Sequence, residues 1–164
     1  MGKILITGVA GLLGSRLADW IIKNTDYKVV GIDDLSGGFS ENINRSVEFY
    51  KFNLVDLQAL KGVFEKENIE TVYHFAAYAA EGLSPFIRKY NYENNLIVST
   101  NLITCCIQHE ISRFVFASSM SVYGNKYEPP FNENLPQAPI DPYAVAKYAV
   151  EMDLEIANKQ HGLK

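Results

Sequence analysis

The stretch KILITGVAGLLGSRLADWIIKNT, residues 3–25, decides the fold of this chain. Residues 3–8 are a short apolar run, which is typical of a buried strand. Residues 11–25 carry apolar side chains at helical spacing. A strand that leads through a glycine-rich turn directly into a helix is the opening unit of a parallel α/β sheet.

The same alternation continues along the rest of the chain. The further strands are near-continuous apolar runs, which is the pattern of a parallel sheet covered on both faces. Repeated strand–helix–strand units imply right-handed crossovers and a doubly wound sheet. We expect strands at 27–34, 46–53, 71–77 and 112–119, and helices at 56–68, 85–110 and 142–159, with Pro85 in the first turn of its helix.

Three glycines, Gly8, Gly11 and Gly14, lie in the turn between the first strand and its helix. Glycine allows a positive φ and lets a pyrophosphate approach the backbone, and the last glycine allows the helix to pack close to the strand. The free N–H groups of the helix N-terminus would attract the phosphates. Glycines alone are equally compatible with a tight turn that binds nothing.

The end of the second strand favours a turn that binds a cofactor over one that binds nothing. Asp33 follows Gly14 by about 20 residues, where a carboxylate can accept hydrogen bonds from the hydroxyls of an adenosine ribose. It would also repel a 2′-phosphate, and Asp34 adds a second negative charge. We therefore expect NAD rather than NADP, although a solvated carboxylate at a strand end remains the alternative for Asp33.

A second group of residues suggests chemistry at the other end of the chain. Ser118 and Ser119 end a buried strand, on the edge of the sheet where ligands bind in open α/β folds. Tyr143 and Lys147 are four residues apart and therefore neighbours on one helix face. A nearby ammonium, together with the positive nicotinamide ring of a bound cofactor, would favour the phenolate, so we expect a lowered pKa and a general acid/base at Tyr143. A surface pair on a helix is the alternative.

Taken together, these residues resemble the extended short-chain dehydrogenases, in particular the NAD-dependent sugar-nucleotide epimerase/dehydratase group. The resemblance extends over the whole chain, and its motifs are TGVAGLLG, DDLSGG, VYHFAA, NNL, ASSMSVYG and YAVAK. It implies a Rossmann fold over residues 1–164 and catalysis by Ser119, Tyr143 and Lys147, with transient oxidation of the sugar to a keto-sugar.

The resemblance also implies a set of cofactor-binding residues. Asn53 and Leu54 match the adenine position, Ala76 and Ala77 the cleft, and Asn95 the nicotinamide side. The complete expected set is Gly8, Gly11, Leu12, Leu13, Gly14, Asp33, Asp34, Asn53, Leu54, Ala76, Ala77, Asn95, Ser118, Tyr143 and Lys147; no metal is expected.

Three departures from the family pattern bear on function. The adenine position usually carries Asp, but here it is Asn53, whose side-chain carbonyl can still accept a hydrogen bond. Met120 and Ser121 follow Ser119 where dehydratases carry an acid pair, which argues against water elimination. Members of the family also continue beyond the last helix with further strands and a sugar-nucleotide lobe. We therefore expect the cofactor domain of a longer enzyme, inactive alone, although a natural minimal protein is the alternative.

Composition limits the remaining choices. The 164 residues are 48% hydrophobic with a net charge of −4, which fits one globular domain and argues against nucleic acid as main partner. No run is long and apolar enough to span a membrane. Cys105 and Cys106 are adjacent and match no metal spacing, so we expect reduced thiols in a cytoplasmic protein. Helices 85–110 and 142–159 could pair with a second copy as a homodimer.

Two other functions stay open at this point. One is an NAD-binding module without turnover, which the missing substrate lobe favours. The other is a different oxidoreductase of the short-chain dehydrogenase type, such as one acting on a small alcohol, which would need a pocket that the sequence does not reveal.

Overall fold

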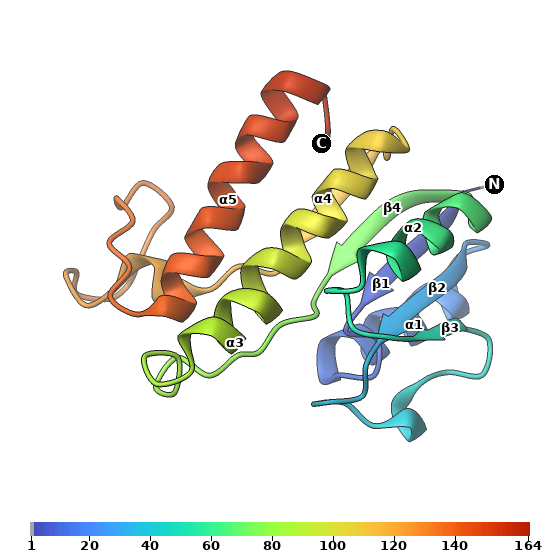
Figure 1. The fold of residues 1–164 in the computed structure, drawn as a ribbon, viewed down its shortest axis with the longest axis horizontal. Coiled ribbons are helices and arrows are strands. Elements are labelled where there is room, and N and C mark those ends of the chain that lie inside the picture. The colour runs from blue at the N-terminus through green and yellow to red at the C-terminus, as the bar shows by residue number, and fades with distance from the viewer. Residues whose placement is uncertain (1) are drawn as a thin grey trace.

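The computed structural model describes residues 2–164 and shows five parallel strands in one sheet, in the order β3-β2-β1-β4-β5 (Figure 1). The chain order reverses between β1 and β4, which creates a crevice at the carboxyl ends of these strands. The expected doubly wound, Rossmann-like α/β fold is thereby confirmed. The strands are β1 Lys3–Thr7, β2 Lys28–Asp33, β3 Glu48–Lys51, β4 Ile69–His74 and β5 Arg113–Phe116.

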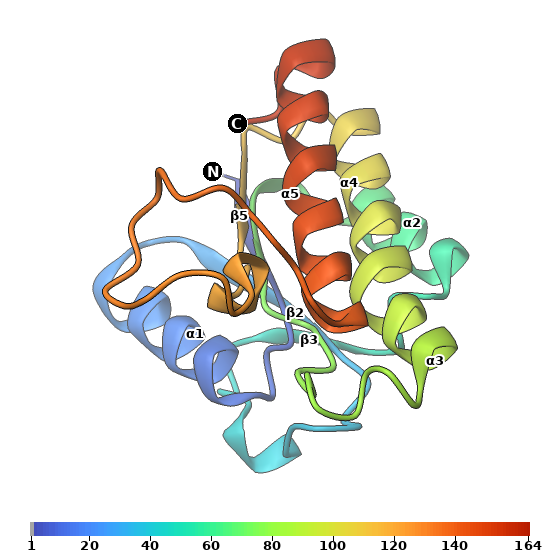
Figure 2. The same ribbon diagram turned by 90° about the vertical axis from the view of Figure 1, so that its left-hand side faces the viewer.

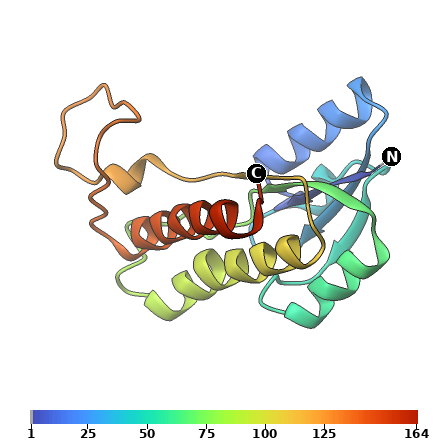
Figure 3. The same cartoon turned by 90° about the horizontal axis from the view of Figure 1, so that it is seen from above.

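Helices cover both faces of this sheet (Figure 3). On one face α1 packs on the apolar side chains of β1 and β2, including Ile4, Ile6 and Val29. The other face carries α2, α4 and α5. The helices are α1 Leu12–Asn24, α2 Leu57–Lys66, α3 Arg88–Tyr92, α4 Val98–Gln108 and α5 Pro142–His161, with the 3-10 turns η1 Ser40–Asn42 and η3 Met120–Tyr123.

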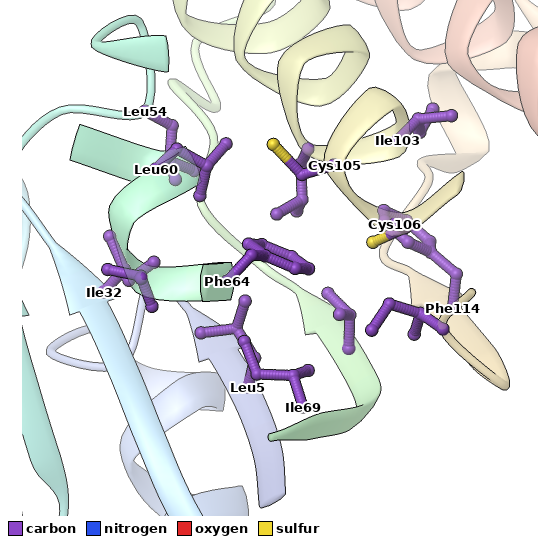
Figure 4. Packing of buried hydrophobic residues seen from close by; sticks show 14 of the residues in the cluster. Leu5, Ile32, Leu54, Leu60, Phe64, Ile69, Ile103, Cys105, Cys106 and Phe114 are labelled. Atoms are coloured by element: carbon purple, nitrogen blue, oxygen red, sulfur yellow. The ribbon is translucent and has the colours of Figure 1, made fainter. Parts of the chain in front are cut away.

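The larger core lies under α2 and α4 (Figure 4). Phe64 of α2 packs among Leu5 and Ile69 of the sheet, and Cys105 and Cys106 of α4 close the same core. Both cysteines are free thiols and fully buried, and burial raises the pKa of each. Between residues 2 and 164, no helix combines the length and apolar character needed to cross a bilayer.

One predicted element was wrong in its details. The single helix expected at 85–110 begins only at Arg88, so Pro85 lies in the preceding turn and not in the first helical turn. The helix is also interrupted by a π-helical turn, η2 Glu93–Ile97, before α4. A π turn inserts one extra residue into a helix and occurs often at functional sites.

The strand at the far edge of the sheet, β5, is shorter than expected. It ends at Phe116, and the chain then leaves the sheet through η3 and a long loop that returns to α5 (Figure 2). Its outer edge is partly paired, because the N–H of Phe114 donates to the carbonyl of Lys164 at 2.6 Å. α4 and α5 lie side by side next to this strand (Figure 2).

Candidate active site

The glycine turn brings the first strand, its helix and the end of β4 into close contact. Gly8 has a φ of +70°, and a Cβ there would meet the backbone nitrogen of Ala76 at 2.7 Å. A Cβ on Gly14 would lie 2.2 Å from the carbonyl oxygen of Gly8. Only glycine fits either position, so the turn has the geometry that the sequence predicts.

A cleft opens beside this turn at the carboxyl ends of β1, β2 and β4. Its lining includes the N-terminus of α1, whose first turn carries no acidic side chain, so the positive end of the helix dipole is not neutralised there. Eight of the expected cofactor residues line it: Gly8, Gly11, Asp33, Asp34, Asn53, Leu54, Ala76 and Ala77.

The two carboxylates of the cleft are held in place by different partners. Asp33 accepts hydrogen bonds from the backbone N–H of Ala10 at 3.0 Å and of Leu35 at 2.8 Å. Asp34 accepts one from the Asn53 amide at 2.7 Å. Partial burial raises the pKa of Asp34, but the hydrogen bonds from Ser36 and Asn53 outweigh it, so its pKa lies below the usual value. The charge of Asp34 therefore persists at neutral pH.

Asn53 stands where the resemblance places an adenine ligand, and its side chain is already engaged. Its oxygen accepts from the N–H of Val55 at 2.9 Å, and its nitrogen donates to Asp34 and, at 3.2 Å, to Asn94. Asn53 therefore orients the carboxylate of Asp34, whereas Asp33 is held by backbone N–H groups.

Several expected residues do not line the cleft. The side chains of Leu12 and Leu13 point to solvent, being 74% and 61% exposed, so only their backbone N–H groups could face a phosphate. Gly14 lies behind the turn. Asn95 is buried, and its amide pairs with the backbone of Tyr78 instead of reaching into the cleft.

The helix α5 carries the tyrosine and lysine, and its start is well defined. Asp141 caps it by accepting from the N–H of Ala144 at 2.8 Å, and Pro142 occupies its first position. This cap places Tyr143 in the first turn and Lys147 one turn later, both buried against the end of β5.

Lys147 is 3% exposed and does not contact the phenol directly. Its Nζ donates to the carbonyl of Ala117 at 2.8 Å and lies 4.6 Å from the centre of the Phe116 ring. The Tyr143 ring centre is 5.8 Å away. Burial lowers the pKa of Lys147 to about 8.

Without a bound cofactor the pKa of Tyr143 lies above its usual value, so the lowering expected with the nicotinamide ring present stays a prediction. Burial raises the pKa of the phenol, and the carboxylates of Glu81 and Asp141 raise it further, while the Ser119 hydroxyl acts in the opposite direction. Burial wins because the ammonium of Lys147 is aimed at a carbonyl and not at the phenol. Tyr143 is therefore a neutral phenol here.

The two serines after β5 have separate partners. Ser119 caps η3, and its Oγ accepts from the hydroxyl of Ser121 at 2.8 Å. Ser118 donates to the carboxylate of Glu151 on α5 and does not line the cleft. The structure thus gathers Ser119, Tyr143 and Lys147 near one end of β5, beside the lining of the cleft and not in it. Ser118 instead joins the segment after β5 to α5.

Several residues of the cleft are not among those expected from the sequence. Gly37 and Gly38 belong to the DDLSGG motif and could have been included on that signal. Tyr78 and Tyr90 form an edge-to-face pair with ring centres 5.0 Å apart, which no local sequence pattern indicates. Asn94 and Val98 complete this wall from the π turn and α4.

Comparison with known proteins agrees with this geometry. Residues 4–164 match the model of the NAD dependent epimerase/dehydratase family. The chain is 34% identical to the UDP-glucose 4-epimerase of Bacillus subtilis and 32% identical to that of Streptococcus mutans, over 96% and 98% of its own length. It covers 49% of each of these proteins, so it spans about half the length of its relatives.

Solved structures give the same result. The UDP-glucose 4-epimerase of Thermotoga maritima, with UDP-glucose, superposes with a TM-score of 0.94 at 36% identity, over 99% of this chain and 53% of that one. The enzyme of Thermus thermophilus, in complex with NAD, gives 0.94 at 31% identity, over 99% and 52%. The cofactor expected from the sequence is confirmed by the family. On its motifs, its fold and these matches, the chain belongs to the NAD dependent epimerase/dehydratase family.

Proposed function

We propose that this chain is the NAD-binding part of a nucleotide-sugar 4-epimerase, in which one NAD lies in the cleft and its nicotinamide end faces Tyr143 and Lys147. The observation that carries the proposal is the shared location of two groups. The phosphate turn and the acidic ribose site lie at the carboxyl ends of β1 and β2, and the Tyr–Lys helix packs against the end of β5 in the same sheet.

The residues present fit a dinucleotide. Gly8 and Gly11 line the cleft at the N-terminus of α1, where glycine backbone lets a pyrophosphate approach the free N–H groups of the helix. The carboxylates of Asp33 and Asp34 suit the ribose hydroxyls and oppose the 2′-phosphate of NADP. Bound NAD would supply a reversible hydride acceptor for a sugar carbon.

The chain's own residues would handle the proton. Tyr143 would take it from the sugar hydroxyl and return it, and Ser119 would hold that hydroxyl by a hydrogen bond. Lys147, whose ammonium form prevails below its pKa of about 8, would bind the nicotinamide ribose and favour the phenolate. Because burial raises the pKa of Tyr143 without ligand, its activation depends on the charges that arrive with the cofactor.

The sugar nucleotide would be held mainly by a lobe outside these residues. The relatives are about twice as long as this chain, and the described residues offer one cleft of cofactor character. We expect the 164 residues alone to turn over UDP-galactose far more slowly than about 1 per second, a typical enzyme rate. A rate at or above that value would refute the proposal that the sugar nucleotide is held mainly outside these residues. A module that binds NAD without turnover is the second candidate, favoured by the same half-length match.

Titration calorimetry with NAD and NADP tests the cofactor assignment. We expect NAD to bind and NADP to bind far more weakly. Asp33→Ala should weaken NAD by about tenfold to a hundredfold, because hydrogen bonds to a charged group contribute about 1.5–3 kcal/mol. Asp26→Ala removes the same charge from an exposed position outside the cleft and is the matched control. Equal effects of the two substitutions would refute the role of Asp33.

We also propose a homodimer through the outer face of η2 and α5. Val145, Met152 and Ile156 form a stripe on α5 and are 41–49% exposed, and Ile97 of η2 is 43% exposed. Exposed apolar faces of this kind mark interaction surfaces. Met152→Glu with Ile156→Glu should convert a dimer into a monomer in sedimentation equilibrium. A wild-type chain that is monomeric at all concentrations would refute the proposal.

A further inference from the structure

A ladder of buried polar side chains follows one face of the helix that contains the π turn. Asn91, Asn95 and Ser99 are spaced four residues apart and are at most 1% exposed. Three polar side chains at such depth are costly unless each is hydrogen-bonded. Within residues 2–164, every buried side-chain nitrogen or oxygen has a partner, so the ladder is fully satisfied.

The upper end of the ladder joins the cleft wall to the catalytic helix. The Asn95 amide accepts from the N–H of Tyr78 at 3.0 Å and donates to its carbonyl at 3.2 Å. The same amide donates to Oδ1 of Asn91 at 2.9 Å. Asn91 in turn donates to the carbonyl of Pro142 at 2.9 Å, directly before Tyr143.

The lower end of the ladder reaches the glycine turn. The Ser99 hydroxyl donates to the carbonyl of Asn95 at 2.6 Å, so it must accept from Nε2 of His74 at 2.9 Å. Nδ1 of His74 then accepts from the Thr7 hydroxyl at 2.6 Å, and Thr7 accepts from the N–H of Ala76 at 3.2 Å. Burial and the nearby Lys147 lower the pKa of His74 to about 3, so the imidazole is neutral at neutral pH. Nε2 therefore remains the donor and Nδ1 the acceptor.

We infer that Asn91 is a positioning residue that fixes the first turn of α5, and with it Tyr143 and Lys147, against the cofactor cleft. The contact of Asn91 with Pro142 is a side-chain bond in the ladder that crosses from the cleft wall to α5. An apolar residue at position 91 could fill the same space. The paired amides of Asn91 and Asn95 do more, because their hydrogen bonds form only when α5 has one position relative to Tyr78. The inference rests on the proposed function for its meaning, but its first test does not require NAD.

Hydrogen exchange measured by mass spectrometry is that first test. Asn91→Ala should speed exchange about tenfold at Tyr143–Val145, because the bond to the carbonyl of Pro142 is lost. It should also speed exchange in the segment that contains Tyr78, because Asn95, which holds Tyr78, loses its bond to Oδ1 of Asn91. Asn158→Ala is the matched control: it removes an equivalent amide, which donates to the carbonyl of Leu163 at 2.8 Å, from the far end of α5. Unchanged exchange at Tyr143–Val145 in the folded Asn91→Ala variant would overturn the inference. If that variant does not fold, Asn91→Ser replaces it, since its hydroxyl is too short to reach Pro142.

A double-mutant cycle on NAD affinity separates positioning from general stability. Asn91→Ala should weaken NAD about tenfold, or about 1.4 kcal/mol, in the wild-type background. In the Lys147→Met background, where the proposed ribose contact is gone, the further loss should be at most about threefold. An equal tenfold loss in both backgrounds would overturn the inference. If wild type binds no NAD, the proposed function fails, and hydrogen exchange still decides the role of Asn91.

Discussion

Gly14→Ala should destabilise the protein because the first helix lies too close to the glycine turn to admit a methyl group. The new Cβ would lie 2.2 Å from the Gly8 carbonyl oxygen and 2.8 Å from the Cα of Val9. Side chains almost never approach within 3.0 Å, so α1 must move away by about 0.8 Å, the difference between 3.0 and 2.2 Å. Both partners are backbone atoms and cannot rotate away.

The magnitude follows from two opposing effects. Replacing glycine within a helix by alanine normally gains about 0.5–1 kcal/mol. Overpacking a core contact costs about 1–3 kcal/mol, and here it acts on backbone. We therefore expect a net loss of about 1–2 kcal/mol in the free energy of unfolding.

Gly62→Ala provides the control, because Gly62 also lies within a helix but has no atom within 4 Å of the added Cβ. It should gain about 0.5–1 kcal/mol in urea denaturation, where Gly14→Ala loses stability. NAD affinity should fall in Gly14→Ala and stay unchanged in Gly62→Ala. If both variants unfold at a higher urea concentration than wild type, the close contact between turn and helix is not what the structure shows.

The remaining predictions concern Lys147, the cysteines and the Asp34–Asn53 pair. Because the pKa of Lys147 is lowered to about 8 from 10.5, the unfolded chain binds more protons between these values, so stability should rise as pH increases from 8 to 10.5. Lys147→Met should remove this part of the rise in urea titrations at several pH values, and an identical pH dependence in both proteins would contradict the burial of the ammonium. Cys105 and Cys106 should react with a thiol reagent only after unfolding, and rapid labelling of the native protein would contradict their burial. Asn53→Ala should raise the pKa of Asp34 by removing a hydrogen bond from its charged form, which NMR titration of the carboxyl carbon would detect; an unchanged value would show that Asn53 does not stabilise the charge.

Local patterns were enough to predict the sheet and the tight glycine turn after β1. The apolar side chains of the strands and helices recur with clear periods. The glycine spacing and Asp33 can be recognised together because they lie within one strand–helix–strand unit of about 30 residues. The predicted boundaries differ from the observed ones mainly where long-range pairing sets the length of a strand. β4 begins at Ile69 because it pairs with Lys3 of β1, a contact that no local pattern contains.

The parts that sequence reasoning missed depend on the relation between distant segments. The π turn at Glu93–Ile97 accompanies the bonds of Asn91 and Asn95 to Pro142 and Tyr78, and neither partner is close in sequence. The raised pKa of Tyr143 follows from burial and from the direction of the Lys147 side chain, which the spacing of the pair does not define. Neighbours four residues apart on a helix need not be each other's partners.

The central claim is that the acidic cleft and the Tyr–Lys helix serve one NAD molecule. A crystal structure of the chain grown with NAD tests this claim most directly. We expect the adenosine beside Asp33 and Ala76, and the nicotinamide ribose within hydrogen-bonding distance, about 2.6–3.2 Å, of Tyr143 or Lys147. NAD bound at another place, or with its nicotinamide end directed away from α5, would contradict it.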